Sequence, residues 1–310
     1  MAQQVEVETQ AHGPETGGPA RVPPALPEQR RRSFRLKVAL VWAGIFALMT
    51  VLFAIAKFDV GWMRDNFRFI ATGVWVTIVT AVAAIALALV LALLGALGRL
   101  SKNPVAYGIS GFYTSFFRGT PLILQLFLWY FALPQVAGNL HDGGHLPEAL
   151  YRVSLLSPVV AGIIGLGFNY GAYMTEIFRA GILAVGPGQT EAADALGMTY
   201  RQRMRRVVLP QAFKVVIPPT GNEFIAMMKD TALVAFLGSP VFYWDLFKRA
   251  QTLGSQAFKP MEALIVAAGI YWALTITFSY FQSRLEARVS RGYVREAARP
   301  AGRRQRATEA

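Results

Sequence analysis

The chain has 310 residues, of which 54% are hydrophobic and only 16% are charged, and its formal net charge is +13. A soluble domain carries about 25% charged residues, so this composition indicates a membrane protein and excludes an ordinary soluble domain. The chain has no cysteine, which excludes disulfides and thiolate metal sites, and its 3 histidines are scattered, so no metal site is expected. The Lys and Arg residues lie in tails and loops between apolar stretches, a distribution that does not indicate nucleic-acid binding.

The two ends of the chain differ in composition from its middle. Residues 1–37 are rich in Pro, Gly, Gln and Glu and then in Arg, which predicts a disordered tail. Residues 286–310 form a second, basic tail. Between them we expect an additional N-terminal transmembrane helix with its loop over 38–66, and the main transmembrane domain over 67–285.

Long charge-poor stretches recur between the tails, and a helix needs about 20 apolar residues to cross a bilayer. They predict an all-α integral membrane protein with about six transmembrane helices. The fifth stretch contains Glu223, Lys229 and Asp230, and it is counted because its flanks would otherwise lie on the wrong sides of the membrane. The six spans are expected within residues 38–56, 69–98, 119–140, 153–183, 215–237 and 263–283.

The first apolar stretch allows two interpretations. Basic residues precede it and Ala54-Ile55-Ala56 ends it, as in a cleavable signal peptide. The apolar run is longer than the usual 7–15 residues of a signal peptide, which favours an uncleaved anchor. N-terminal sequencing of the mature protein distinguishes the two.

The distribution of basic residues predicts the orientation. With six spans and the N-terminus inside, the cytoplasmic segments are 1–37, 98–118, 183–214 and 282–310, and they hold 22 Lys and Arg residues against 7 in the opposite segments. Cytoplasmic loops are richer in Lys and Arg. Both termini and the polar loop at 186–211 are therefore expected in the cytoplasm.

This polar loop contains several helix-end signals. Gly186, Pro187 and Gly188 end the preceding span, and a short helix is expected from Gln189 with Glu191 in its first turn. Gly197 predicts a left-handed cap, and Thr199 with Gln202 predicts a capping box for a second helix that ends or kinks at Pro210. The loop is expected to form two short helices that meet at a glycine, with Ala192 and Ala193 giving the first a smooth surface.

The spacing of this loop resembles a known motif. Glu191-Ala192-Ala193, three residues, Gly197, nine residues, Val207, one residue and Leu209-Pro210 resemble the EAA loop of bacterial ATP-binding cassette import permeases, with Val207 where the family has Ile. Residues 117–126, 170–179 and 229–233 are similar to the polar amino acid branch of these permeases, which serves histidine, glutamate, glutamine, arginine and opines. Ala232 stands where Ser is frequent in that branch.

The resemblance covers about residues 67–285 and implies a five-helix core, to which the first span is an addition. It implies a permease subunit in the bacterial inner membrane that imports polar amino acids by alternating access. Its partners would be cytoplasmic ATPase subunits that use ATP and Mg²⁺, an extracytoplasmic amino-acid-binding protein, and a second permease chain, identical or related. The implied coupling residues are Glu191, Ala192, Ala193, Gly197, Leu209 and Pro210.

The chain itself has no Gly-x-x-x-x-Gly-Lys-Ser/Thr phosphate loop. We therefore expect a non-catalytic subunit with no bound cofactor or metal, whose ATP hydrolysis comes from a partner.

Polar residues within the spans are candidates for the substrate path, because charges inside a membrane are costly and usually functional or paired. A zwitterionic amino acid needs a cation for its carboxylate and an anion for its ammonium. Lys229 fits the first role, and Glu223 or Asp230 the second. The full set of candidates is Asn169, Asn222, Glu223, Lys229, Asp230 and Thr231. Glu176 and Arg179, three residues apart, are expected to form a structural ion pair.

Two other functions remain open at this point. One is a secondary transporter of amino acids driven by an ion gradient, which needs no ATPase. The other is a membrane scaffold whose interior charges are packing pairs. Whether uptake requires ATP and further proteins distinguishes these from an ATP-driven importer.

Overall fold

The computed structural model describes residues 28–238 and 240–289, so most of the two predicted tails lies outside the described residues. Within the described residues every regular element is a helix and none is a strand. The predicted all-α class is confirmed. The chain divides into two units, residues 1–58 and 59–310.

The first unit contains one long helix, α1 (Glu28–Ala56). Its segment Leu36–Ala56 is long and apolar enough to cross a membrane. The helix begins earlier than the expected span because the Glu, Gln and Arg residues that precede it are good helix formers.

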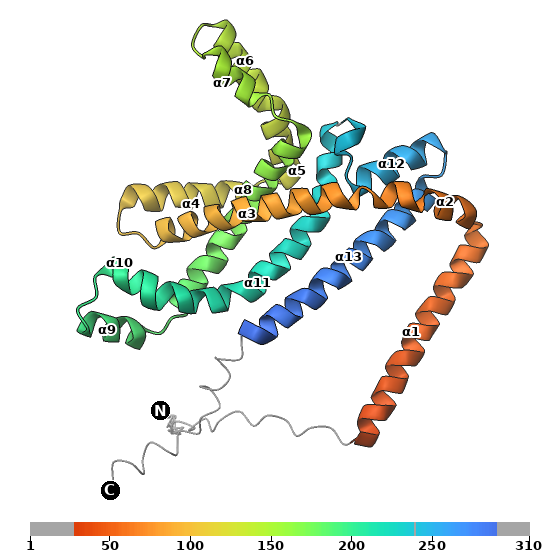
Figure 1. Cartoon of the computed structure of the whole chain (residues 1–310), viewed down its shortest axis with the longest axis horizontal. Helices are drawn as coiled ribbons and strands as arrows, with labels where there is room; N and C mark the ends of the chain where they lie inside the picture. The colour runs from red at the N-terminus through yellow and green to blue at the C-terminus, as the bar shows by residue number, and fades with distance from the viewer. Residues whose placement is uncertain (1–27, 239, 290–310) are drawn as a thin grey trace, which may run out of the picture. The chain divides into compact units, whose positions relative to one another are not determined.

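The second unit contains all the remaining elements, which Figure 1 shows in rainbow order. They are α2 (Val60–Ala71), α3 (Val74–Arg99), α4 (Pro104–Gly119), α5 (Leu122–Phe127), the π-helix η1 (Leu128–Ala132), α6 (Leu133–Asp142), α7 (Glu148–Ser154), α8 (Pro158–Leu183), α9 (Pro187–Ala195), α10 (Tyr200–Arg203), the π-helix η2 (Met204–Val208), α11 (Leu209–Asp230), the 3-10 helices η3 (Thr231–Leu237) and η4 (Val241–Tyr243), α12 (Leu246–Gln256) and α13 (Pro260–Val289).

Each expected span is mainly helical, but not every span is strongly apolar. Four helical segments in the described chain qualify as membrane spans by length and composition, namely Leu36–Ala56, Val60–Arg99, Leu122–Asp142 and Pro260–Val289, and a fifth qualifies if α7 and α8, bent by 78°, are one broken span. Helix α11 is not among them, because it carries the charged residues Glu223, Lys229 and Asp230.

Residues 98–118, expected as a cytoplasmic segment between two spans, include most of helix α4, which was not predicted from the sequence. Asn103 caps its first turn by accepting a bond from the amide of Val105 at 2.9 Å, and Pro104 takes a first-turn position that needs no N–H donor. The helix turns back along α3, and the hydroxyl of Ser110 donates to the carbonyl of Gly95 at 2.6 Å. Helix α4 is therefore an additional element, and the segment from α4 to α6 is one interrupted helical path.

The break between α4 and α5 is stabilised by side-chain amides. Thr120 and Pro121 are extended, which leaves carbonyls at the end of α4 without helical partners. The buried Gln125 donates to the carbonyls of Phe117 and Thr120, at 2.9 and 3.1 Å. Asn169 of α8 also donates to the carbonyl of Phe117, at 3.0 Å.

Small residues bring α3 and α8 close together at the centre of the second unit. Ala84, Ala88, Ala92 and Ala96 recur every fourth residue on α3 and are fully buried. A Cβ atom on Gly167 of α8 would lie 2.6 Å from Cδ2 of Leu87, so a larger residue there would require the Leu87 side chain to move. These close contacts follow the small-residue packing of membrane helices.

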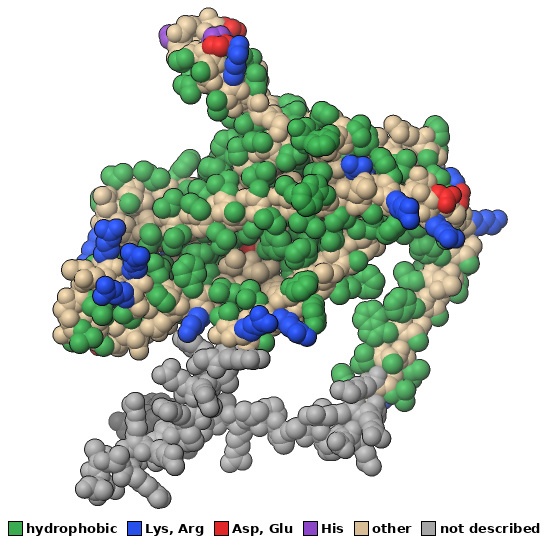
Figure 2. Space-filling model, viewed as in Figure 1, with side chains coloured by type: hydrophobic (Ala, Val, Ile, Leu, Met, Phe, Trp, Pro, Cys, Tyr) green, Lys and Arg blue, Asp and Glu red, His purple; other side chains and the backbone are tan. Residues whose placement is uncertain are grey.

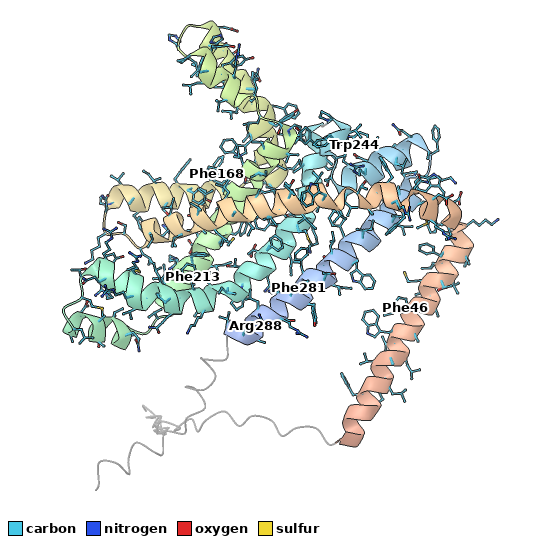
Figure 3. The ribbon with its side chains drawn as sticks, viewed as in Figure 1. Phe46, Phe168, Phe213, Trp244, Phe281 and Arg288 are labelled. Atoms are coloured by element: carbon cyan, nitrogen blue, oxygen red, sulfur yellow. The ribbon has the colours of Figure 1, made fainter. Side chains whose placement is uncertain are left out.

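The outer surface of the second unit is mostly apolar. Figure 2 shows hydrophobic side chains over the long helices, with Lys and Arg gathered around α9 and α10. Phe168, labelled in Figure 3, lies on α8 against the ring of Trp129, with ring centroids 5.1 Å apart. The hairpin of α6 and α7 projects away from the rest of this unit in Figure 1.

Candidate functional site

Helix α9 and its two ends follow the local sequence signals. Gly186 precedes the helix and Pro187 is its first residue, and Gly197 after its last turn has φ of 72°. The amide of Gly197 donates to the carbonyl of Asp194 at 2.9 Å, and that of Met198 to the carbonyl of Ala193 at 3.1 Å. The predicted left-handed glycine cap is confirmed. Because the helix starts at Pro187, Glu191 lies in its second turn, not in the first turn as expected.

The second helix of the loop starts as predicted but does not stay short. The capping box is present, since Thr199 accepts from the amide of Gln202 and the Gln202 side chain accepts from the amide of Thr199. From Tyr200 onward α10, η2 and α11 follow one another without a break. Pro210 lies in the first turn of α11, and the preceding π-turn closes with the amide of Leu209 on the carbonyl of Met204. The wider π-turn accommodates the proline, so the expected second short helix is wrong.

Two side-chain contacts hold α9 against the helix that follows. Near its start, Gln211 donates to the side chain of Gln189 at 3.3 Å. At its end, Arg203 pairs with the carboxylate of Asp194. Ala193 between them is 3% exposed and faces the protein. Helix α9 is therefore attached at both ends to the residues that lead into α11.

The outward side of α9 offers a mixed surface. Glu191 and Ala192 are exposed, and Glu191 has no hydrogen bond or ion pair with any residue in the described part of the chain. Leu196 and Tyr200 are also largely exposed. An exposed carboxylate beside small and apolar side chains is the kind of surface that a protein partner covers.

The root of this loop is packed into the membrane helices. Val208, Ala212 and Val216 are buried together with Phe178 and Ile182 of α8. Leu209 is half-buried against this cluster and Pro210 is exposed. Movement of α9 would therefore be transmitted to α8 and α11.

The polar residues at the end of α11 have different surroundings. Asp230 accepts a hydrogen bond of 2.8 Å from the hydroxyl of Tyr170, whose ring is buried in α8. The ammonium of Lys229 is exposed and has no partner among residues 28–238 and 240–289. Thr231 is buried and donates to the carbonyl of Met228 at 2.8 Å.

The remaining substrate-path candidates differ in exposure and in their hydrogen-bond partners. Glu223 is half-buried, and Asn222 is exposed and accepts from Gln282 of α13 at 2.9 Å. Asn169 lies at the α4–α5 break described above, where it also donates to Gln125 at 3.2 Å. The structure thus brings Asp230 against Tyr170 of α8.

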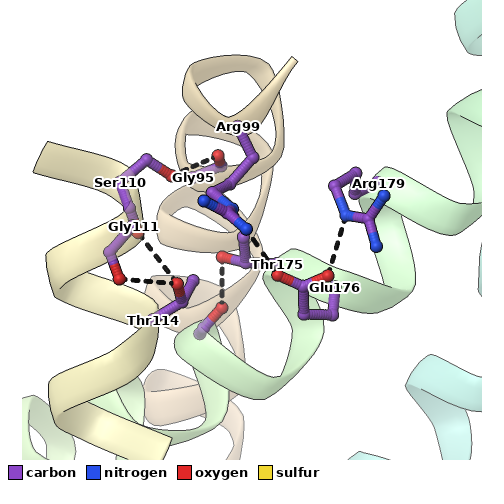
Figure 4. Close-up of polar contacts among 9 residues, drawn as sticks. Gly95, Arg99, Ser110, Gly111, Thr114, Thr175, Glu176 and Arg179 are labelled. Atoms are coloured by element: carbon purple, nitrogen blue, oxygen red, sulfur yellow. Dashed lines mark hydrogen bonds and ion pairs between the residues drawn. The ribbon is translucent and has the colours of Figure 1, made fainter. Parts of the chain in front are cut away.

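The expected ion pair in α8 is present, and it has a third member that the sequence did not indicate. Arg179 donates to Glu176 at 2.8 Å, and Arg99 from the end of α3 approaches the other oxygen of Glu176, as Figure 4 shows. Within the described residues no group of three or more His, Cys, Asp or Glu side chains is placed to hold a metal ion.

Comparison with known proteins fits this geometry. Residues 85–291 match the family described as "Binding-protein-dependent transport system inner membrane component". The chain belongs to this family. The permease is therefore an inner-membrane component of a binding-protein-dependent transport system, and it carries the helical loop and interrupted spans described above.

Individual relatives match about three quarters of the permease. It is 37% identical over 235 residues to "Probable amino-acid permease protein YxeN" of Bacillus subtilis, covering 76% of this chain and 97% of the relative. It is 38% identical to "Arginine transport system permease protein ArgU" of Corynebacterium glutamicum, covering 73% and 70%. A solved amino acid ABC transporter with histidines matches with a TM-score of 0.61 and 34% identity, over 74% of this chain and 98% of that one.

Proposed function

We propose that this permease translocates polar amino acids across the bacterial inner membrane by alternating access coupled to a separate ATPase. The substrate class is supported by relatives whose names specify amino acids and arginine. ATP and Mg²⁺ would be used by the partner, since the chain has no phosphate loop. Lys/Arg bias supports cytoplasmic termini.

The observation that carries this proposal is the attachment of α9. An exposed helix that carries the unpaired Glu191 is held at both ends by Gln189–Gln211 and Asp194–Arg203. Such a helix is available to a groove on an ATPase, while its root is packed against α8. When the ATPase subunits approach each other, α9 would move the membrane helices and exchange the two access states. In this role Ala192 and Ala193 give a close fit, Gly197 sets the turn, and Leu209 and Pro210 connect the loop to α11.

The substrate path is the second part of the proposal. Lys229 is the candidate cation for a substrate carboxylate, because its ammonium is exposed and has no partner in the described chain. Glu223 and Asn222 lie on the same helix and are candidates for contact with the ammonium group. Asp230 and Asn169 would act mainly by holding the helices that border the path, since each bonds to another helix, whereas Thr231 bonds to the carbonyl of Met228 just before it.

The complete transporter would contain further chains. A second permease, identical or related, would complete the path, and two ATPase subunits would bind the α9 helices. An extracytoplasmic binding protein would deliver the amino acid.

The variant Glu191→Lys tests the coupling role. We expect it to abolish ATP-dependent uptake in vesicles that contain the ATPase and the binding protein, and to weaken co-purification of the ATPase. Membrane insertion should not change, because Glu191 has no partner in the described chain whose loss would destabilise the fold.

The matched control is Asp142→Lys, which reverses an equally exposed carboxylate on the α6–α7 hairpin. It should leave ATPase association unchanged. Full uptake by Glu191→Lys would contradict the coupling role of α9, and wild-type uptake that needs no ATP would contradict the proposed function as a whole.

A further inference from the structure

A polar hollow lies between α3, α4 and α8, and no residue of the coupling loop or of α11 lines it. Its volume is about 440 Å³. Figure 4 shows Arg99, Thr114 and Glu176, which belong to its lining. The lining residues are Arg99, Gly111, Thr114, Ser115, Arg118, Gly119, Tyr173 and Glu176.

Two guanidinium groups reach this hollow from different helices. Arg99 lies over the ring of Tyr107, with its Cζ atom 4.7 Å from the ring centroid, and Arg118 lies over the ring of Tyr173 at 5.4 Å. Stacking on a ring face supports a guanidinium and leaves its N–H groups free to donate at its edge. Arg118 has no hydrogen bond or ion pair with another residue in the described ranges.

The only carboxylate of the lining does not balance these charges. One oxygen of Glu176 accepts from Arg179 at 2.8 Å. Its other oxygen is 3.8 Å from Nε of Arg99, too far for a hydrogen bond. That Nε atom is buried and has no hydrogen-bond partner among the described residues. Arg99 and Arg118 line the hollow together with Glu176, and Glu176 also pairs with Arg179, so one carboxylate serves three guanidinium groups.

The Nε atom of Arg99 is a buried donor without a partner among the described residues, which is costly, whereas the side chain of Arg118 is exposed. An oxygen anion would remove the cost at Arg99 and pair with the charge of Arg118, because its two or three oxygens match the fork of a guanidinium. The hydroxyl of Ser115 is a further donor in the lining. The hydroxyl of Thr114 already donates within α4, to the carbonyls of Ser110 and Gly111, both at 3.0 Å.

We propose that this hollow binds one oxyanion, a phosphate or a carboxylate, between Arg99 and Arg118. Two sources supply this chemistry at a membrane: the headgroup of an acidic phospholipid, and the carboxylate of the transported amino acid. The second source rests on the proposed function, whereas the first does not.

The lipid arm of the experiment uses the full chain in nanodiscs of phosphatidylcholine and phosphatidylglycerol, with native mass spectrometry to count retained phosphatidylglycerol. We expect Arg118→Gln to lower its retention about tenfold, the effect of losing charge-assisted hydrogen bonds. Lys102→Gln is the matched control, because it removes an exposed charge from the α3–α4 turn outside the hollow. It should retain phosphatidylglycerol as the wild type does.

The amino-acid arm uses the same proteins in phosphatidylcholine alone, with radiolabelled L-arginine and L-glutamine as probes. Binding that Arg118→Gln lowers about tenfold and Lys102→Gln does not would assign the site to the substrate carboxylate. Neither arm contains an ATPase, so a failure here does not bear on coupling through α9.

A third measurement needs no variant and guards against a misfolded Arg118→Gln protein. Phenylglyoxal modifies accessible arginines, and peptide mass spectrometry of the wild type reports on Arg99 and Arg118. We expect slower modification of both when phosphatidylglycerol or the bound amino acid is present. Equal modification with every probe, together with equal retention by Arg118→Gln and the wild type, would overturn the proposal.

Discussion

Lys229 and Asp230 are neighbours in the sequence, yet their side chains serve different purposes. Asp230 accepts a hydrogen bond from Tyr170 across two helices, whereas Lys229 is exposed. We expect Lys229→Ala to raise the KM of uptake without changing thermal stability. Tyr170→Phe should instead lower stability by about 1.5–3 kcal/mol, because it removes a hydrogen bond to a charged group.

The two effects are separated by measuring uptake kinetics and the thermal unfolding midpoint for both variants. ATPase co-purification serves as the control, and it should be normal in each because neither residue contacts α9. If Lys229→Ala has wild-type uptake kinetics, Lys229 is not on the substrate path.

At the scale of elements, the sequence predicted best what depends on neighbouring residues. The Gly197 cap and the Thr199–Gln202 box each involve residues a few positions apart, and both are present. Pro210 was expected to end or kink the second helix, and the helix does not end there, because a proline in a first turn after a π-turn is tolerated.

Helix α4 was not predicted from the sequence, because hydropathy was used to identify the spans. Hydropathy counts Ser110 and Thr114 as polar, although both are buried with their hydroxyls bonded to backbone carbonyls. The hollow was missed because Arg99 and Glu176 lie far apart in the sequence and meet only through the packing of α3 on α8. No local pattern encodes such a contact.

The attachment of α9 leads to a prediction for this element. The Asp194–Arg203 pair is partly exposed, with side-chain exposures of 53% and 23%, so its contribution to folding is about 0.2–1 kcal/mol. We expect Asp194→Arg to leave the protein folded but to reduce the amount of amino acid carried per ATP hydrolysed. Uptake and hydrolysis measured together in proteoliposomes give this ratio.

The double variant Asp194→Arg with Arg203→Asp restores an opposite-charge pair and should recover part of the ratio. If the amount of amino acid carried per ATP is as low in the double variant as in the single variant, the opposite-charge contact is not what transmits the movement. Loss of folded protein in the single variant would instead indicate a structural role.

At the scale of the whole second unit, stability should depend on pH through Asp245. This residue precedes α12, a short polar helix outside the predicted spans, and caps it by accepting from the amide of Lys248 at 2.9 Å. The next amide, that of Leu246, donates to Thr77 of α3 at 3.3 Å. The junction therefore joins α12 to a long membrane helix.

Burial raises the pKa of Asp245 to about 6, despite bonds from backbone amides that favour its charged form. The folded state thus keeps the proton at pH values where the unfolded chain has lost it. Stability should fall by on the order of 3 kcal/mol as the pH rises from about 4 to about 6, and then level off. Thermal unfolding measured across this range checks the trend.

The variant Asp245→Asn keeps a capping side chain but cannot ionise. Its unfolding midpoint should therefore not fall between about pH 4 and about pH 6, whereas the midpoint of the exposed control Asp142→Asn should fall as in the wild type. The same fall in Asp245→Asn as in the wild type would assign the pH dependence to another group.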